Sequence, residues 1–437
     1  MFSYYLELAL RSLRRSPGLT ALMVLAIGFG VAASMTTWSV FRAVSGDPIP
    51  WKSSQLFVPQ IDNWGPNGRS DDGEPPNAMG YTDAMALMRD HRAKRQSAMY
   101  QISPSVVPAE AGKHPLNVSG HAVYGEFFPM LDVPFKYGSG WSASDDTNRA
   151  TVVVISAKLN QKLFGGASRV GKTVNIEGKD YRVVGVLDDW NPQPRFYDVV
   201  NTGGFSTTGD DVFLPFLTAI QAAMPNDGNT NCNAVPEESG FVGLQHSECV
   251  WIAYMAELDS AAATAYRNYL NDYAREQQQA GRFRWAPNGR LRNLPEWLDN
   301  QHVVPSDTKV SLLVALGLLL VCLVNTVGLL LAKFLRRSGE IGVRRALGAQ
   351  RAAIYAQFLT EAGIVGLAGG VLGLLLTGAG VASVGWVLPR DIAALARVDV
   401  SLLLLTLLVA VVATMLAGLY PTFRASRVQP AWQLKSN

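Results

Sequence analysis

Four long stretches without a charged residue constrain the fold of this chain more than any other feature. They comprise residues 19–41, 310–332, 362–389 and 400–423. A helix needs roughly 20 mostly apolar residues to cross the hydrocarbon core of a bilayer, and soluble proteins rarely sustain a core helix of that length. The sequence therefore predicts an α-helical membrane protein with four transmembrane helices. We expect the first to be a retained anchor, because the apolar region of a cleavable signal peptide runs only roughly 7–15 residues.

These helices divide the chain into segments of very different size. We place the spans at residues 19–44, 309–333, 354–388 and 400–423. Residues 45–308, inserted between helices 1 and 2, are numerous enough to bury a core of their own. The remaining segments are short and comprise residues 1–18, 334–353, 389–399 and 424–437.

Local patterns in the large segment predict an α+β domain. The expected elements are a strand at residues 151–156, helices at 81–96, 157–164 and 261–279, and a hairpin formed by 174–176 and 181–186. The strand is predicted because β-branched residues dominate it. Residues 191–243 look like a loop and predict no regular element.

Charge is distributed unevenly along the chain and predicts its orientation. Three segments outside the large one are basic: they carry Arg11, Arg14 and Arg15, then Lys333, Arg336, Arg337, Arg344, Arg345 and Arg351, and finally Arg424, Arg427 and Lys435. In the short segment 389–399, Arg390 and Arg397 are balanced by Asp391 and Asp399. Residues 46–308 instead hold 22 Lys and Arg against 30 Asp and Glu, a net charge of −8. Because basic loops stay in the cytoplasm, the large domain and residues 389–399 are predicted to be periplasmic, across a bacterial inner membrane. The overall charge of +3 conceals this division and does not indicate nucleic-acid binding.

Residues 1–18 predict an amphipathic helix on the cytoplasmic membrane surface. Leu6, Leu10 and Leu13 share one helical face, and Arg11 and Arg14 lie opposite. Such a helix would contact membrane lipid through its apolar face.

The cysteines fall in two environments. Cys322 lies in the second span, whereas Cys232 and Cys249 lie in the predicted periplasmic domain. An oxidising compartment permits disulfides, so we expect Cys232 and Cys249 to pair.

The third span is rich in glycine. Gly366 with Gly370, and Gly369 with Gly373, form two small-xxx-small pairs. Such pairs let helix backbones approach closely, which favours tight packing or a seam that slides during function.

One motif imitates a nucleotide site. Residues 166–173 fit the phosphate-loop pattern G-x-x-x-x-G-K-[ST]. That loop must follow a strand and open a helix, whereas here a predicted helix precedes it and a hairpin follows. We interpret it as a turn. The histidines show no metal-ligand spacing and no catalytic triad is recognisable, so we expect no metal site and no catalytic residue.

The most informative polar cluster lies between the second and third spans. From Glu340 onward a helix would place Ile341, Arg344, Arg345 and Gly348 on adjoining faces, with Leu347 beside them. A short helix that mixes apolar and guanidinium groups suits docking into a groove on a soluble partner. The alternative is a basic loop that only fixes topology, and charge alone does not separate the two.

Several motifs resemble one known family. The stretch from Asn325 into residues 340–349, and residues 420–430 near the end, resemble the FtsX-type permease core. Residues 125–134, 163–166, 170–173 and 181–186 resemble the MacB periplasmic domain. The matches follow in order along essentially the whole chain.

This resemblance implies a mechanism. Such permeases pair as dimers, of one kind of protomer or of two related ones, and each binds an ABC ATPase that holds ATP and Mg²⁺. Closure of the ATPases is passed through the membrane helices to the periplasmic domains. By match, residues 334–353 are the coupling loop, and the chain itself is expected to be no enzyme and to hold no cofactor.

One departure from MacB concerns the ATPase. MacB carries it at its own N-terminus, whereas this sequence starts with the membrane-surface helix, so we expect a separate ATPase polypeptide. An adaptor and an outer-membrane channel are further candidate partners. Efflux or export is the leading interpretation; a lipoprotein-releasing permease and an FtsX-like regulator of a periplasmic hydrolase are the alternatives.

Overall fold

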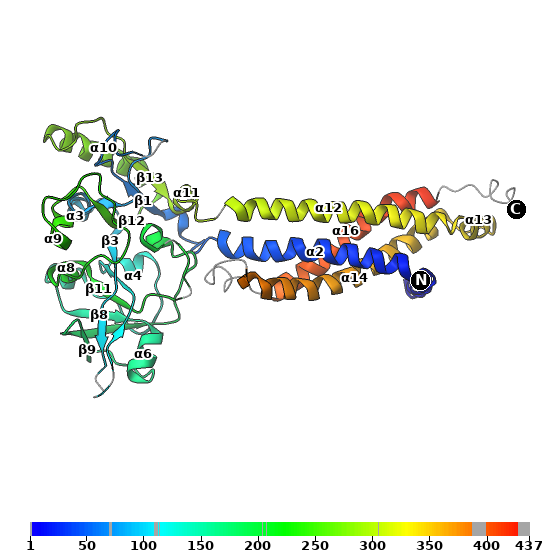
Figure 1. Ribbon diagram of the computed structural model, residues 1–437, viewed down its shortest axis with the longest axis horizontal. Coiled ribbons are helices and arrows are strands. Elements are labelled where there is room, and N and C mark those ends of the chain that lie inside the picture. Colours follow the sequence, from blue (N-terminus) through cyan, green and yellow to red (C-terminus); the bar gives the residue numbers. More distant parts are fainter. Residues whose placement is uncertain are drawn as a thin grey trace. The chain divides into compact units, whose positions relative to one another are not determined.

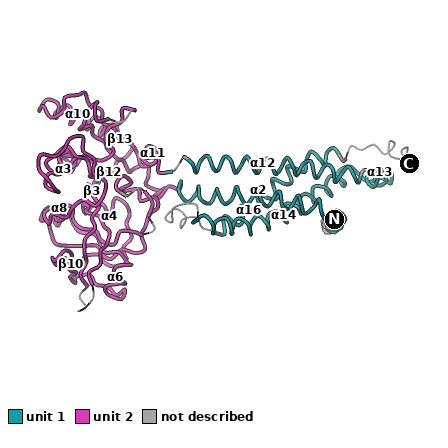
Figure 2. Tube along the Cα trace, viewed as in Figure 1, with its two compact units in different colours: residues 1–45, 304–437 teal, residues 46–303 magenta. Residues whose placement is uncertain are grey.

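The computed structural model describes residues 2–69, 72–108, 112, 114–202, 204–206, 208–304, 306–386 and 399–426. The chain divides into two compact units (Figure 2). Unit 1 comprises residues 1–45 and 304–437, and unit 2 comprises residues 46–303.

Unit 1 is a bundle of long apolar helices (Figure 1). Its long helices are α2 (Pro17–Ser45), α12 (Ser306–Leu335), α14 (Arg351–Ser383, extended by the 3-10 turn η3, Val384–Trp386) and α16 (Val400–Ser426). Among the described residues, four helices are long and apolar enough to cross a membrane. Both α12 and α14 contact α2 and α16, so the four helices pack as one bundle. The prediction of four membrane helices is confirmed at this level.

Two short helices lie at one end of this bundle, where α2 and α14 begin and α12 and α16 end. They are α1 (Phe2–Arg15) and α13 (Ser338–Ala346). Helix α2 begins at Pro17, because a proline at the first position of a helix gives up no hydrogen bond. We call this end of unit 1 the basic end.

At the opposite end of the bundle an ion pair joins two of the long helices. Arg42 of α2 lies 2.8 Å from the Asp399 carboxylate and donates to Ser401 Oγ at 2.8 Å. Of the predicted short loop, 389–399, only Asp399 belongs to the described residues, and of the tail, 424–437, only residues 424–426 do.

Unit 2 is built on one hydrogen-bonded path of strands. Its order is β13 (Arg290–Asn293), β1 (Leu56–Gln60), β12 (Val250–Glu257), β3 (Arg95–Ile102), β6 (Gly120–Val123), β11 (Val212–Pro215), β8 (Val152–Ile155), β10 (Lys179–Leu187), β9 (Thr173–Ile176), β4 (Ser105–Val107) and β5 (Leu116–Asn117). Two further strands join it from the side: β2 (Met79–Gly80) pairs with β12, and β7 (Phe135–Gly138) pairs with β10. The pairs β6–β11 and β8–β10 are parallel, and the other strand pairs are antiparallel.

The central strands are buried on both faces, which explains their near-continuous apolar sequence. In β3, Tyr100 joins one core while its neighbour Met99 joins the other. In β12, Tyr254 and Met255 divide in the same way.

Helices complete both cores of unit 2. The helical elements are η1 (Ser53–Gln55), α3 (Tyr81–Asp90), α4 (Phe127–Met130), α5 (Ala143–Thr147), α6 (Ala157–Phe164), η2 (Phe196–Asp198), α7 (Val199–Thr202), α8 (Phe216–Gln221), α9 (Gly240–Gln245), α10 (Ser260–Gln279) and α11 (Leu294–Asn300). Leu87 of α3 and Leu270 of α10 pack into the first core. Phe127 of α4 and Trp297 of α11 pack into the second.

Unit 2 differs from the sequence analysis in one helix end and in one segment that the sequence left unassigned. The helix expected at 81–96 ends at Asp90, because His91 takes a left-handed conformation with φ of 45° and β3 begins at Arg95. The segment 191–243, which we expected to be a loop, contains η2, α7, α8, α9 and the central strand β11. Strand β11 has only four residues, all buried, so it shows no polar alternation that would reveal it.

Candidate coupling site

Charged contacts surround Glu340 near the start of α13. This acid lies in the first helical turn, where a negative charge is favourable to the helix dipole. Arg337, at the N-cap, places Nη2 3.1 Å from Glu340 Oε2, and Arg344, one turn later, places Nη2 2.7 Å from Glu340 Oε1. Both arginines therefore hold the start of α13 in a helical conformation.

The helix ends earlier than expected, at Ala346. Gly348 has a φ of 93°, and its N–H donates to the Arg345 carbonyl at 3.1 Å. Ala349 N–H reaches back to the Arg344 carbonyl at 3.0 Å. Left-handed glycines commonly close helices in this way. Gly348 therefore terminates α13 and does not form part of a helical face, which corrects the sequence expectation.

Residues expected on one docking face of α13 point in different directions. Ile341 is only 5% exposed and packs among Phe334, Ile354 and Phe358 of the chain's own bundle. Leu347, in contrast, is 83% exposed. Ile341 therefore fixes α13 to the bundle and is not exposed for docking to a partner.

Other α13 side chains outline an exposed face. Val343 is exposed, and Arg345 is partly exposed. Arg344 donates from Nη1 to Gln357 Oε1 of α14 at 3.0 Å, so it is held against the bundle. Val343 and the C-cap residue Leu347 are one turn apart, and Arg345 lies between them in sequence and on another side of the helix. We call these three residues together the exposed face of α13.

A buried carboxylate lies beneath this helix, in α14. The Glu361 side chain is fully buried. Lys333 of α12 places Nζ 2.5 Å from Glu361 Oε1, and Ser12 of α1 donates to the same oxygen at 2.7 Å. Arg337 places Nη1 3.4 Å from Glu361 Oε2 and donates to Ser12 Oγ at 2.7 Å. Residues from α1, α12, α14 and the start of α13 therefore meet at one carboxylate.

This cluster, Ser12, Lys333, Arg337 and Glu361, was not predicted as a site. Glu361 stands out in sequence as an isolated acid at the start of an apolar span. Its partners are not recognisable there, because Ser12 lies 349 residues away along the chain.

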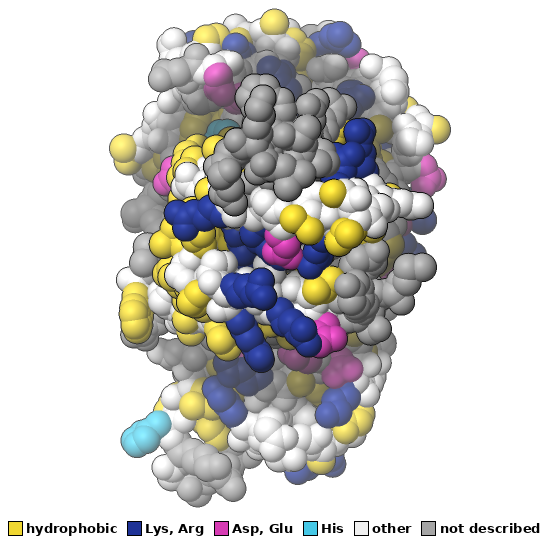
Figure 3. All heavy atoms as spheres, turned by 90° about the vertical axis from the view of Figure 1, so that its right-hand side faces the viewer, with side chains coloured by type: hydrophobic (Ala, Val, Ile, Leu, Met, Phe, Trp, Pro, Cys, Tyr) yellow, Lys and Arg dark blue, Asp and Glu magenta, His cyan; other side chains and the backbone are white. Residues whose placement is uncertain are grey.

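Positive charge dominates the basic end of unit 1. Its described basic side chains comprise Arg11, Arg14, Arg15, Lys333, Arg336, Arg337, Arg344, Arg345, Arg351 and Arg424, against the acids Glu7, Glu340 and Glu361. Figure 3, which views the structure from this end, shows Lys and Arg side chains gathered around the centre of the view.

The glycine pairs of α14 pack against two different helices. A Cβ on Gly366 or Gly370 would lie 3.0 Å from Thr414 Cβ or Ala410 Cβ of α16. A Cβ on Gly369 would lie 2.8 Å from Ile27 Cγ2, and one on Gly373 would lie 3.3 Å from Val31 Cγ1, both in α2. The glycines therefore let α14 approach both neighbours closely.

In unit 2, the stretch at 166–173 is a turn. Helix α6 precedes it, and β9 begins at Thr173. Gly171 N–H donates to the Val183 carbonyl, and Val183 N–H donates to the Lys172 carbonyl, both at 2.8 Å. The amides are used in pairing with β10, and no helix N-terminus is present to hold a phosphate. A separate feature of this unit is the disulfide that joins Cys232 to Cys249.

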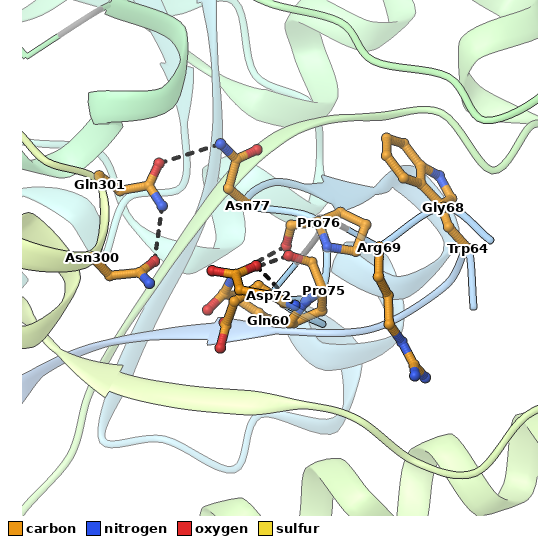
Figure 4. A pocket seen from close by; sticks show the side chains of 11 residues that line it. Gln60, Trp64, Gly68, Arg69, Asp72, Pro75, Pro76, Asn77, Asn300 and Gln301 are labelled. Atoms are coloured by element: carbon orange, nitrogen blue, oxygen red, sulfur yellow. Dashed lines mark hydrogen bonds between the residues drawn. The ribbon is translucent and has the colours of Figure 1, made fainter. Parts of the chain in front are cut away.

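Unit 2 also has an open hollow of about 400 Å³ (Figure 4). Four of its eleven lining residues carry side-chain amides, and the others include Arg69, Asp72 and Glu74. Gln60 donates to the Pro76 carbonyl at 3.2 Å, Asn77 to Gln301 Oε1 at 3.2 Å, and Gln301 to Asn300 Oδ1 at 3.1 Å. Since these amides bond to one another and to the backbone, we do not take the hollow as the functional site.

A second buried charged cluster fastens the segment before β11 to the sheet. His121 of β6 places Nε2 2.9 Å from Asp198 Oδ2 and Nδ1 2.9 Å from Asp210 Oδ2. Arg195 Nη1 lies 3.2 Å from Asp210 Oδ1, and Tyr197 donates to Asp210 Oδ2 at 2.5 Å. Burial would lower the pKa of His121, but the two carboxylates outweigh it and raise that pKa to about 9. Burial would raise the pKa of Asp210, but His121 and Arg195 hold it at about 2.

Comparison with known proteins defines the class of this chain. Residues 20–265 match the MacB-like periplasmic core domain, and residues 312–430 match the FtsX-like permease C-terminal domain. The chain therefore belongs to the MacB/FtsX-type family of ABC transporter permeases.

Particular relatives are exporters. The chain is 25% identical over 371 residues to the pyoverdine export ATP-binding/permease protein PvdT of Pseudomonas aeruginosa. The aligned region covers 82% of this chain and 48% of that protein. It is 24% identical over 389 residues to the macrolide export ATP-binding/permease protein MacB of Escherichia coli K12, with 86% and 52% covered. The chain thus spans about half the length of the curated relatives it matches.

Among solved structures, the periplasmic region of MacB from Actinobacillus actinomycetemcomitans is similar, with a TM-score of 0.35 and 14% identity. The similarity covers 56% of this chain and 92% of that structure.

Proposed function

We propose that this chain is the permease subunit of a MacB-type ABC transporter for efflux or export. In this proposal an ABC ATPase is a separate subunit that docks at the basic end, and its motion is passed through unit 1 to unit 2. Family membership supports the class of protein. The observation that carries the coupling role is the exposed face of α13, a mixed apolar and cationic surface on a helix fixed firmly from below.

The orientation follows from charge. The basic end carries ten Lys and Arg against three Asp and Glu among its described residues. By the positive-inside rule this end belongs in the cytoplasm, where an ATPase has access to ATP. Unit 2 then lies in the periplasm of a bacterial inner-membrane protein, where the Cys232–Cys249 disulfide is compatible with the redox environment.

Docking would use the exposed face of α13. Leu347 is nearly free of its own chain and can enter an apolar groove, and Arg345 can pair with an acid at the rim. ATP and Mg²⁺ would be held by the ATPase, so the permease itself needs no cofactor. A second permease protomer would complete the transporter dimer. An adaptor and an outer-membrane channel are further partners that we propose for export.

The proposal predicts that changes on the exposed face of α13 release the ATPase. Arg345→Glu and Leu347→Asp should each weaken ATPase recovery by at least about tenfold, since placing like charges against each other, or an unpaired charge in an apolar groove, costs several kcal/mol. The measurement is co-purification of the ATPase with tagged permease from native membranes.

Arg424→Glu is the matched control. Arg424 is an exposed arginine in the last turn of α16, at the same end of unit 1 but outside α13. It should leave recovery unchanged, and membrane insertion should be normal in all three variants. Equal recovery with Arg345→Glu, Leu347→Asp and wild type would reduce α13 to a topology signal.

A further inference from the structure

The cluster around Glu361 has the geometry of a joint. One carboxylate receives Lys333 from α12, Ser12 from α1 and Arg337 from the start of α13, while Glu361 itself belongs to α14. The side chains of Ser12 and Lys333 are almost fully buried as well. The Glu361 side chain therefore links its own helix to three other elements, all at the basic end.

The chemistry of the cluster makes it sensitive to position. Burying charges costs several kcal/mol per ion, and mutual attraction offsets this only when the geometry is good. A displacement of α13 would move Arg337 away from Glu361 and Ser12. The Arg337 guanidinium also donates to Glu340, with Nη2–Oε distances of 3.1 and 3.2 Å. Rotation of α13 would therefore disturb the contacts of Arg337 with both Glu340 and Glu361. Charged contacts of this kind specify one arrangement more sharply than apolar packing.

Apolar packing alone leaves α13 less firmly fixed. Ile341 contributes the main buried apolar side chain of α13, and α13 has only nine residues. Phe334 and Phe358 stack beneath it with ring centroids 4.2 Å apart, and the Arg337 guanidinium lies 5.9 Å from the Phe358 ring. These contacts join α12 to α14, and Leu13 of α1 packs against the same apolar cluster. Ser12 adds a polar contact from α1 to Glu361.

We propose that Glu361 is a positioning residue that locks α1, α12, α13 and α14 into one rigid joint, so that force applied at α13 moves the membrane helices. This inference rests on the proposed docking of an ATPase at α13 and concerns the step after docking. Glu361 does not contact the partner; it decides whether movement of α13 is passed on or absorbed by local rotation.

The first test needs no partner. Full-length permease in lipid nanodiscs is digested with trypsin, and cleavage after Arg345 is followed by mass spectrometry. Glu361→Gln keeps the shape of the side chain but removes the carboxylate that faces Lys333, and among the described residues it leaves Arg337 with the Glu340 carboxylate alone. We expect cleavage about tenfold faster, because α13 opens locally, while the unfolding of unit 2 stays unchanged. Glu361→Asp retains the charge and should restore much of the protection.

Thr360→Val is the matched control for these variants. Thr360 is the neighbouring residue on α14, and among the described residues its hydroxyl bonds only to its own helix, at the Ala356 carbonyl. The isosteric Thr360→Val variant should be cleaved after Arg345 at the wild-type rate. If the Glu361→Gln variant is also cleaved at the wild-type rate, the proposed role of Glu361 is wrong, whether or not an ATPase is ever found.

The second test uses the complex that co-purifies from native membranes. With the Glu361→Gln variant we expect normal ATPase recovery. The ATP hydrolysis rate of this complex should equal that of the isolated ATPase, because the permease no longer influences its partner. Loss of ATPase recovery with unchanged cleavage would place Glu361 in docking and overturn the joint. A wild-type permease that recovers no ATPase would overturn the proposed function, and the cleavage test would still decide the joint.

Discussion

Fully buried charges occur in both units, and each is compensated by charges of the opposite sign. Glu361 in unit 1 faces Lys333 and Arg337, and His121 in unit 2 lies between Asp198 and Asp210. Such clusters add little net stability compared with apolar packing, but removing one partner is costly because it leaves an isolated charge. At the scale of the residue these clusters therefore hold neighbouring segments in one fixed arrangement.

The His121 cluster predicts how the stability of unit 2 depends on pH. The pKa of His121 in the folded protein, about 9, lies above its ordinary value of 6.5. The protonated imidazole therefore stabilises the fold fully below pH 6.5, and this contribution disappears as the pH rises through 9. The difference amounts to up to about 3 kcal/mol in the free energy of unfolding.

The measurement is denaturant unfolding of the full chain, followed by tryptophan fluorescence, between pH 6 and 10. Wild type should lose stability over this range, whereas His121→Gln should start lower and change less. Parallel pH profiles for the two proteins would show that His121 is not charged in the folded state.

At the scale of the element, glycine positions decide how closely α14 packs. Gly369→Ala should destabilise the bundle by about 1–3 kcal/mol, because the new methyl group would lie 2.8 Å from Ile27 Cγ2 in a packed interface. Gly378→Ala on the same helix is the control, since a Cβ there meets nothing within 4 Å. The thermal midpoint of purified permease should fall for the first variant only. Equal midpoints would indicate that α2 and α14 separate without cost.

The elements that sequence reasoning found are those with a strong local pattern. Helix α6 and the β9–β10 hairpin have their residues in the expected places, because helical spacing and β-branched runs are local signals. Strand β11 was missed because it is short and buried on both faces. The orientation of α13 was missed as well. The sequence of 340–349 does not show which side of the helix packs on the bundle, and contacts of Arg337, Arg344 and Gln357 decide this.

At the scale of the whole molecule, the division into two units corresponds to a division of charge. Residues 46–308 carry a net charge of −8, whereas basic side chains gather at the end of unit 1 formed by α1 and α13. One family match covers most of α2 and of unit 2, and the other covers most of the last three long helices. The proposed path of motion runs from α13 through the Glu361 joint into the glycine-lined contacts of α14.

The most direct test of this account is photo-crosslinking from the exposed face of α13. A photoreactive amino acid in place of Leu347 is activated in living cells, and the captured protein is identified by mass spectrometry. The same residue in place of Leu404, an exposed side chain of α16 within the apolar span, is the control. The account predicts that position 347 captures an ABC ATPase and position 404 does not. Capture of no ATPase at position 347, or equal capture at both positions, would contradict it.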